Sequence, residues 1–254
     1  MPNTDPVDLL IVCDDWPPMH ALAASLTTLG PVVAHGANEP DLPDDLSVYD
    51  VVIMYIHKVM DTRVEQALIR YASQGGRLLV LHHGLASAKI HNPDWLALAG
   101  LHLEPKDALK HAWRVAGHVT HTLVNLNQSH YITTNNVRYD RSVPYQPSEG
   151  FSRPGLFPAL DFFDTEVFLN QQVIDGREKT VLFGVMCDDP VSGKIIMQDR
   201  GGWYKRAGDG WLFYLQPGHT AEEFRKPAYV QIIMNCMMWR AACSSKANFQ
   251  LTTH

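Results

Sequence analysis

Two adjacent histidines, His82 and His83, follow a short apolar run and are the residues in this sequence best placed to do chemistry. The run comprises Leu78 to Leu81, and Gly84 follows the histidines. A short apolar run bounded by turn residues indicates a buried strand of a parallel sheet. In open α/β sheets, ligands bind in the crevice outside the carboxyl ends of the strands. The two imidazoles are therefore our first candidates for a functional site.

Polar residues also follow two other apolar runs. Asp14 comes directly after the run at residues 8–13, and His57 comes directly after the run at 50–56. Asp14 is placed either to bind a ligand or to cap the helix that follows, because aspartate is a common helix N-cap. His57 either faces the same crevice or is a buried, hydrogen-bonded histidine.

The elements that would position these residues alternate between strand and helix over the first hundred residues. Apolar runs predict four strands, and two segments with apolar residues at helical spacing predict helices between them. The predicted strands are 8–13, 32–35, 50–56 and 78–81, and the predicted helices are 19–29 and about 61–74. This order indicates βαβ units with right-handed crossovers. The first hundred residues are therefore predicted to be flavodoxin-like.

The remainder of the chain has a different pattern. Polar and apolar residues alternate from Trp113 to Thr134, which is typical of antiparallel or edge strands. Proline and glycine residues predict a long inserted loop at about 135–160, and loops of this length are more often functional than idle. Further strands are predicted near 179–186, 195–198 and 210–215, and a final helix is predicted at about 227–242. We expect a single α/β domain, residues 1–254, with a mixed sheet.

The composition is that of an ordinary globular protein, with 46% hydrophobic and 19% charged residues. The net charge of −6 and the lack of a basic cluster argue against nucleic acid as a partner. The four cysteines lie far apart without a CxxC pair, so neither a zinc ribbon nor a disulfide framework is expected. No run reaches the roughly 18 apolar residues that span a bilayer, and the N-terminus lacks a signal-peptide pattern. We therefore expect a cytoplasmic protein with no membrane partner.

Three blocks of the sequence resemble the ThuA-like (trehalose-utilisation) family. They are Leu-His-His-Gly at 81–84, Asp-Thr-Glu-Val-Phe at 164–168, and a C-terminal block at 212–239 that contains Gln-Pro-Gly-His-Thr and ends in Met-Trp. The resemblance extends over nearly the whole chain. It implies the class I glutamine amidotransferase-like fold, which has a mixed, mostly parallel sheet with helices on both faces.

The resemblance also implies which residues form the site. They are His82 at the strand end, Glu166 in the acidic-aromatic block and His219 in the Gly-His-Thr turn, with Asp164 nearby as a substrate contact. Many relatives carry a small residue at the position of His83, so any role of this histidine would be specific to this branch.

Two activities of related folds are not expected. In glutamine amidotransferases a nucleophilic cysteine occupies the turn after the corresponding strand, whereas no cysteine lies near His82 in this sequence. Because thiolate chemistry needs the thiol at that turn, we do not expect a glutaminase. Ser87 lacks the G-x-S-x-G pattern of a nucleophile elbow, which disfavours a serine hydrolase.

Several imidazoles and a carboxylate fit two kinds of site. In the first, His82, Glu166 and His219 bind a divalent metal, with zinc the best match, and leave a position open for water or substrate. In the second, the same residues and His83 act as general acids and bases, since imidazole titrates near neutral pH. A nucleotide cofactor is not expected in either case.

The family is linked to sugar catabolism alongside nicotinamide-dependent dehydrogenases that make 3-keto-glycosides. The resemblance therefore implies a following step on such an oxidised sugar: isomerisation, or elimination or hydrolysis of the glycosidic group. The candidate substrate contacts are Asp14, Trp16, His57, Asp164, Trp203 and Tyr204, in which the aromatic rings would stack on a sugar. Trp203 and Tyr204 are alternatively an aromatic pair of a hairpin that binds no ligand.

Two alternatives to this function stay open: a catalytically silent sugar-binding or scaffold protein of the same fold, and a metal-dependent hydrolase. The expected partners are a small sugar substrate and a nicotinamide-dependent sugar dehydrogenase. A homo-oligomer is a further expectation, because the middle segment and the Met-rich C-terminal helix offer apolar surface. The same helix is alternatively part of the core.

Overall fold

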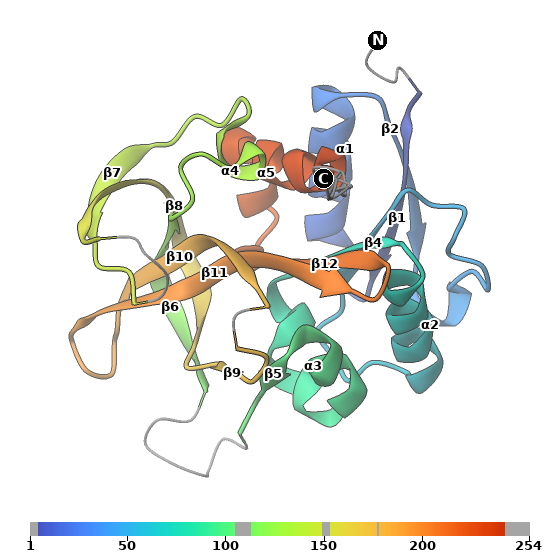
Figure 1. The fold of residues 1–254 in the computed structure, drawn as a ribbon, viewed down its shortest axis with the longest axis horizontal. Helices are drawn as coiled ribbons and strands as arrows, with labels where there is room; N and C mark the ends of the chain where they lie inside the picture. Colours follow the sequence, from blue (N-terminus) through green and yellow to red (C-terminus); the bar gives the residue numbers. More distant parts are fainter. Residues whose placement is uncertain (1–4, 105–112, 149–152, 177, 242–254) are drawn as a thin grey trace, which may run out of the picture.

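The protein is built on one ten-stranded sheet, seen in a computed structural model that describes residues 5–104, 113–148, 153–176 and 178–241 (Figure 1). In sheet order, the strands are β2 (Val32–Ala37), β1 (Val7–Cys13), β3 (Val51–Tyr55), β4 (Arg77–Leu81), β12 (Gly210–Leu215), β11 (Ile195–Ala207), β10 (Thr180–Asp188), β6 (Arg114–Asn125), β8 (Gly155–Leu169) and β7 (Arg141–Tyr145). Two short strands, β5 (Leu101–His102) and β9 (Gln172–Val173), pair separately.

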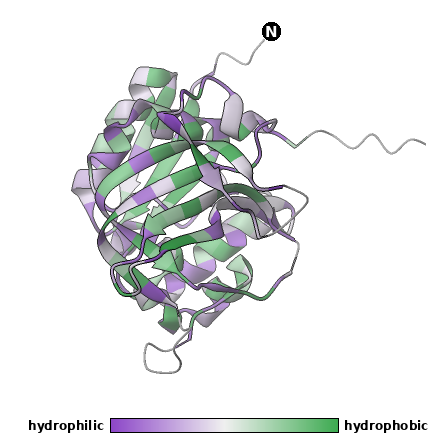
Figure 2. Cartoon of the chain, turned by 90° about the vertical axis from the view of Figure 1, so that its left-hand side faces the viewer, coloured by the Kyte–Doolittle hydropathy of each residue, from purple (hydrophilic) through white to green (hydrophobic). Residues whose placement is uncertain are grey.

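The first five strands of this order, β2 to β12, are parallel to one another. Helices α1 (Trp16–Leu29) and α5 (Pro227–Met238) cover one face, and α2 (Thr62–Ser73) and α3 (Pro93–Ala99) cover the other. Because both faces are covered, every residue of β3 and β4 is buried, which explains the apolar runs Val51–Tyr55 and Leu78–Leu81. Much of the strands is accordingly green in Figure 2, the colour of hydrophobic residues.

The other five strands, β11 to β7, pair antiparallel, so the sheet is mixed, as predicted, and its antiparallel half is as large as its parallel half. The predicted loop at about 135–160 is wrong for half of its described residues, because β7 and the start of β8 lie there. Pro144 is compatible with a strand because it lies in the edge strand β7, where a missing backbone donor is tolerated. The alternating pattern from Trp113 to Thr134 forms a strand only as far as Asn125, and helix α4 (Tyr131–Thr134) follows.

The β6–β8 pair extends beyond the carboxyl edge of the parallel strands. β6 pairs with β10 only over Thr122–Asn125, whereas its earlier residues pair with β8. The far end of β8 then returns to the sheet edge, where the side-chain amide of Gln216 bonds both the backbone N–H and the carbonyl of Phe168. This arm therefore forms a wall over the edge at which β4 and β12 end.

The Met-rich C-terminal helix belongs to the core. Met234 and Met237 of α5 are buried against the sheet, while Met238 at its end is exposed. The helix ends at Met238, and the predicted end at Ala242 lies outside the described residues. Among the described residues, no helix has the length and apolar character needed to cross a membrane.

Candidate metal centre

Four side chains from distant parts of the sequence meet under the β6–β8 arm. His82 and His83 follow β4, Glu166 lies on β8, and His219 follows β12. One ligand atom from each of these residues lies within 4.8 Å of every other. His83, whose role the sequence left open, is therefore a full member of the cluster, and the three residues implied by the family resemblance are brought together.

The atoms of the cluster converge on one carboxylate oxygen. Oε2 of Glu166 lies 3.3 Å from Nε2 of His83, 3.5 Å from Nδ1 of His219 and 3.7 Å from Nε2 of His82. The backbone at His82 has a φ of +47°, in the left-handed region that non-glycine residues rarely adopt. Such strain costs about 1–3 kcal/mol and is concentrated at functional sites.

The protonation state of His82 can be read from its contacts. The imidazole is fully buried, and its Nδ1 donates a hydrogen bond to the backbone carbonyl of Gln216 at 2.9 Å. Burial lowers the pKa of His82 to about 3, so the ring is neutral near pH 7. Because the proton is on Nδ1, the lone pair of Nε2 is directed into the cluster.

Glu166 is ionised in the same environment. The pKa of its carboxyl lies below the usual range, so the group is a carboxylate near pH 7. A lone pair of His82 and a carboxylate oxygen of Glu166 thus face each other at 3.7 Å. Burial also lowers the pKa of His83, which keeps a second imidazole of the cluster neutral.

These atoms fit a bound metal ion. Nε2 of His82, Oε2 of Glu166 and Nδ1 of His219 are buried and have no hydrogen-bond partner among the described residues. A buried polar atom without a partner costs about 1–3 kcal/mol, so three in one place need an explanation. Imidazole nitrogens with a carboxylate oxygen are a common zinc ligand set, and the Gln216 carbonyl fixes the His82 tautomer as second-layer partners of metal ligands do.

Neighbouring residues that the sequence did not single out hold the cluster in place. The ring of Phe168 packs against His82 and His83, with centroids 4.8 and 5.1 Å apart. The hydroxyl of Tyr214 donates to the backbone carbonyl of His82 at 3.1 Å. Gln216 lies in the C-terminal block of the family resemblance, but no spacing rule marks it as the partner of His82.

Asp14 and His57 form a pair beside the cluster. Asp14 accepts hydrogen bonds from the backbone N–H groups of His57 and Lys58 and lies 3.1 Å from Nδ1 of His57. Although burial alone would raise it, these hydrogen bonds hold the pKa of Asp14 well below its usual range. The ring of His57 packs against His83 with centroids 4.3 Å apart. Asp14 therefore orients His57, and the residue at the N-cap of α1 is Asp15.

The buried Lys89 supports the backbone at His57 and Lys58, and its titration gives a test by pH. Nζ of Lys89 donates to the carbonyl of Lys58 at 2.5 Å, and burial lowers the pKa of Lys89 to about 8. In the unfolded chain a lysine titrates near 10.4, so between about pH 8 and 10 the unfolded state binds more protons. The free energy of unfolding of the wild type, relative to Lys89→Met, should therefore rise across this window by up to about 1.4 kcal/mol per pH unit. Urea unfolding at pH 7, 8, 9 and 10 measures it, and a constant difference would contradict the assignment.

Two predicted sugar-stacking residues lie in the core instead. Trp203 and Tyr204 are in the middle of β11, and no hairpin turn occurs there. Trp203 is 1% exposed and packs on the α2 and α3 side, whereas Tyr204 packs on the α5 side with Trp239. The stacking prediction is wrong for both, because neighbouring strand residues point to opposite, covered faces.

Trp16 and Asp164 lie nearer the surface. Trp16 is half-buried at the start of α1, where its Nε1 donates to Oδ1 of Asn38 and its ring stacks on His20. The side chain of Asp164 is 80% exposed and pairs with Nδ1 of His118 at 2.9 Å. Asp164 therefore engages an exposed histidine, and its role as a substrate contact stays a prediction.

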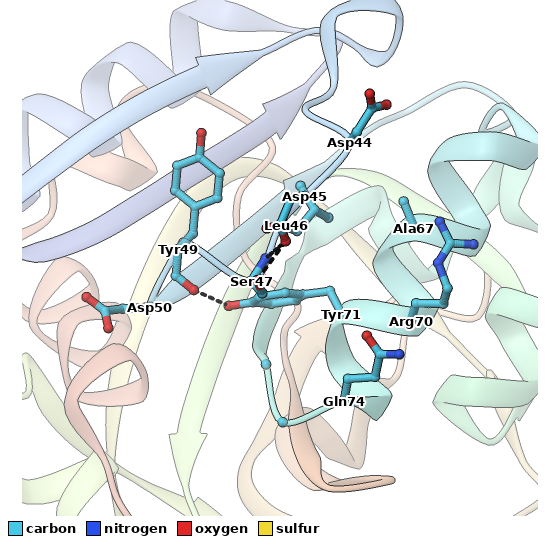
Figure 3. A pocket seen from close by; sticks show the side chains of 12 residues that line it. Asp44, Asp45, Leu46, Ser47, Tyr49, Asp50, Ala67, Arg70, Tyr71 and Gln74 are labelled. Carbon is cyan, nitrogen blue, oxygen red and sulfur yellow. Dashed lines mark hydrogen bonds between the residues drawn. The ribbon is translucent and has the colours of Figure 1, made fainter.

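A cavity of about 380 Å³ lies at the opposite end of the parallel strands, at the amino ends of β3 and β4 (Figure 3). Its polar groups bond to one another: Ser47 donates to Asp45, and the Tyr71 hydroxyl donates to the carbonyl of Tyr49. None of the residues that line this cavity is a histidine. We therefore assign the functional site to the carboxyl edge of the sheet.

The comparisons with known proteins agree with this architecture. No protein-family model matches the sequence, and a search of curated proteins gives no match. A putative thua-like protein from Parabacteroides merdae is 13% identical, with a TM-score of 0.62 over 91% of this chain and 89% of that one. A second putative thua-like protein, from Bacteroides uniformis, is 14% identical, with a TM-score of 0.53 over 94% and 93% of the two chains.

A larger protein contains a similar fold. A β-galactosidase from Bacillus circulans sp. alkalophilus is 15% identical, with a TM-score of 0.51 over 89% of this chain but only 30% of its own. The two thua-like structures, in contrast, match this chain over nearly their whole lengths. The fold implied by the sequence resemblance is therefore confirmed: this chain has the fold of the ThuA-like proteins.

Proposed function

We propose that the protein is a metal-assisted enzyme that acts on an oxidised (3-keto) sugar or glycoside. The observation that carries the proposal is the cluster of His82, His83, Glu166 and His219, in which three buried ligand atoms lack hydrogen-bond partners. Its place at the carboxyl edge of the sheet, where ligands of α/β folds bind, supports the same reading. The sugar substrate follows from the sequence resemblance.

In this proposal, His82, Glu166 and His219 hold the ion, and zinc is the best match for their donor set. A bound zinc ion supplies Lewis-acid polarisation of a carbonyl oxygen. The residues of the chain fix this arrangement: the Gln216 carbonyl holds the tautomer of His82, and Phe168 holds the plane of its ring.

His83 is the residue we assign as the base. It is neutral because burial lowers its pKa, it is partly exposed, and its Nδ1 lies 3.3 Å from the Ser87 hydroxyl. A ketone acidifies the adjacent carbon–hydrogen bond, so Nε2 of His83 would take that proton while the electron pair moves to the carbonyl oxygen as an enediolate. Isomerisation follows when the proton returns to the former carbonyl carbon and the proton of the adjacent hydroxyl passes to the former carbonyl oxygen, which moves the ketone by one carbon. Elimination follows when the enediolate electron pair expels the glycosidic oxygen from the carbon beyond and the proton held by His83 passes to that oxygen, so that the group leaves as an alcohol.

The setting of the enzyme follows from the same proposal. A nicotinamide-dependent sugar dehydrogenase would supply the 3-keto substrate, and we place both enzymes in the cytoplasm. We also propose that the protein forms a homo-oligomer.

The test follows a 3-keto-glycoside, such as 3-keto-trehalose, by NMR in deuterated water. Enzyme reloaded with zinc should consume the substrate and either incorporate deuterium next to the carbonyl, by isomerisation, or form an unsaturated ketone, by elimination. Chelation should reduce the rate at least about tenfold. His83→Gln should lose the deuterium incorporation, whereas the exposed control His118→Ala should retain it. Consumption that yields neither deuterium incorporation nor an unsaturated ketone would favour the metal-dependent hydrolase. Binding without turnover would favour the sugar-binding or scaffold protein, and an unchanged spectrum without binding would end the sugar assignment.

A further inference from the structure

Glu223 is a buried carboxyl group that the proposed chemistry does not use. It begins the short turn of helix Glu223–Arg225, four residues after His219, and is only 5% exposed. It is not a member of the cluster of candidate metal ligands. A buried carboxyl is costly unless hydrogen bonds compensate for the lost water, so its partners indicate what it is for.

One oxygen of Glu223 holds the arm that carries Glu166. The hydroxyl of Thr165 donates to Oε1 of Glu223 at 2.5 Å, and Thr165 itself is buried. Thr165 directly precedes Glu166 in β8, so this bond fixes the backbone one residue away from the carboxylate of the cluster.

The other oxygen holds the turn that carries His219. The backbone N–H of Gly218 donates to Oε2 of Glu223 at 2.6 Å, and the carbonyl of Gly218 accepts from the hydroxyl of Tyr55 at 2.7 Å. Gly218 directly precedes His219. A single carboxyl group therefore bonds the residue before each of two candidate ligands.

The strand ladder alone does not fix Glu166. Pairing between β6 and β8 shifts register between Ala116 and Val119 and again between Val119 and His121, on either side of the pairing of Val119 with Thr165. Asp164, two residues before Glu166, has a φ of +50°. Since bulges interrupt the regular hydrogen bonds of a ladder, this segment needs a tertiary contact to hold it in place.

We propose that Glu223 is a positioning residue that sets the separation of Glu166 and His219 and thereby the affinity and geometry of the metal centre. The inference rests on the proposed metal site. Outer contacts of this kind typically change metal affinity by about 10- to 100-fold when they are removed.

Four variants test the proposal, with Zn²⁺ and Co²⁺ alone as probes. Thr165→Val removes only the bond to the Glu166 arm, and Glu223→Ala removes both bonds. Glu223→Gln is the conservative variant, because its amide oxygen can accept from Gly218 while its NH₂ group donates to Thr165. The control is Glu222→Ala, whose neighbouring carboxylate is 82% exposed.

Thr165→Val and Glu223→Ala should weaken zinc binding by about 10- to 100-fold and alter the visible absorption of the Co²⁺ form. Glu223→Gln and Glu222→Ala should stay within about threefold of the wild type. A purely structural role would lower stability without changing the Co²⁺ spectrum of the folded protein. Wild-type affinity and spectrum in Thr165→Val would overturn the proposal even if Glu223→Ala did not fold.

Failure of the metal site is distinguishable from failure of this inference. If the wild type binds neither ion, the proposed metal centre is wrong, and crystal structures of the wild type and Thr165→Val then decide the role of Glu223. An unchanged distance between Oε2 of Glu166 and Nδ1 of His219, 3.5 Å here, would refute positioning. A lengthened distance with a displaced arm would support it.

Discussion

Glu166→Gln should lose bound zinc, with an affinity at least about 100-fold below that of the wild type. All three imidazoles of the cluster approach Oε2 of Glu166, and this carboxylate is the only anionic group in the cluster. Glutamine keeps the shape of the side chain but removes the charge, and removal of a ligand should exceed the roughly 10- to 100-fold losses seen for outer contacts. Elemental analysis of protein purified without a histidine tag, followed by competition titration with zinc, measures the change.

Asp164→Asn is the matched control for this experiment. It makes the same change of charge on the same strand, two residues earlier, at a side chain that is 80% exposed and paired with His118. The control should bind zinc as the wild type does. Equal zinc content in Glu166→Gln and the wild type would refute Glu166 as a ligand. A wild type that binds no zinc would leave acid–base catalysis by the same residues as the explanation of the cluster.

The parallel half of the fold could be predicted from the sequence because its signals are local. β3 and β4 are buried on both faces, so Val51–Tyr55 and Leu78–Leu81 are apolar runs that end at or next to the strand ends. The ends of parallel strands lie at one sheet edge, and His82 was predicted at that edge by this rule alone. Glu166 and His219 needed the family resemblance, since neither ends an apolar run in a distinctive pattern.

The antiparallel half was harder to predict because its signals are not local. Pro144 and Pro158 weaken any sequence-based strand assignment. Both nevertheless lie in paired strands, Pro144 in β7 opposite Leu156 and Pro158 in β8 opposite Ser142. This pairing becomes apparent only when the partner strand is known. Trp203 was misplaced for a related reason. The glycines before it resemble a turn, but they lie within a long central strand that is covered on both faces.

The contacts that hold the site were the least predictable part. The bond from His82 to the Gln216 carbonyl joins residues 134 positions apart, and the bond from Thr165 to Glu223 joins residues 58 positions apart. Neither pair has a spacing that a helix or strand would impose. Such partners are determined by the packing of the β6–β8 arm on the sheet edge, which only the folded chain defines.

Gly218→Ala should destabilise the protein by about 2–5 kcal/mol and weaken metal binding at the same time. The residue has a φ of +139°, and an added Cβ would lie 2.8 Å from Cζ of Phe224 and 3.2 Å from Cβ of His82. Phe224 is fully buried, so it cannot move away without disturbing the core. The strained backbone and the clash both act on the residue before His219, and urea unfolding with zinc titration measures the two effects together.

Gly75→Ala separates these two contributions. Gly75 also has a positive φ, +108°, but an added Cβ would meet nothing within 4 Å. This control should therefore carry only the backbone strain, about 1–3 kcal/mol, and should bind zinc like the wild type. If Gly218→Ala were no worse than Gly75→Ala in stability and in zinc affinity, the turn before His219 would be free to adjust. The position of His219 would then be set by the ligand it meets, and not by the packing of His82 and Phe224 around Gly218.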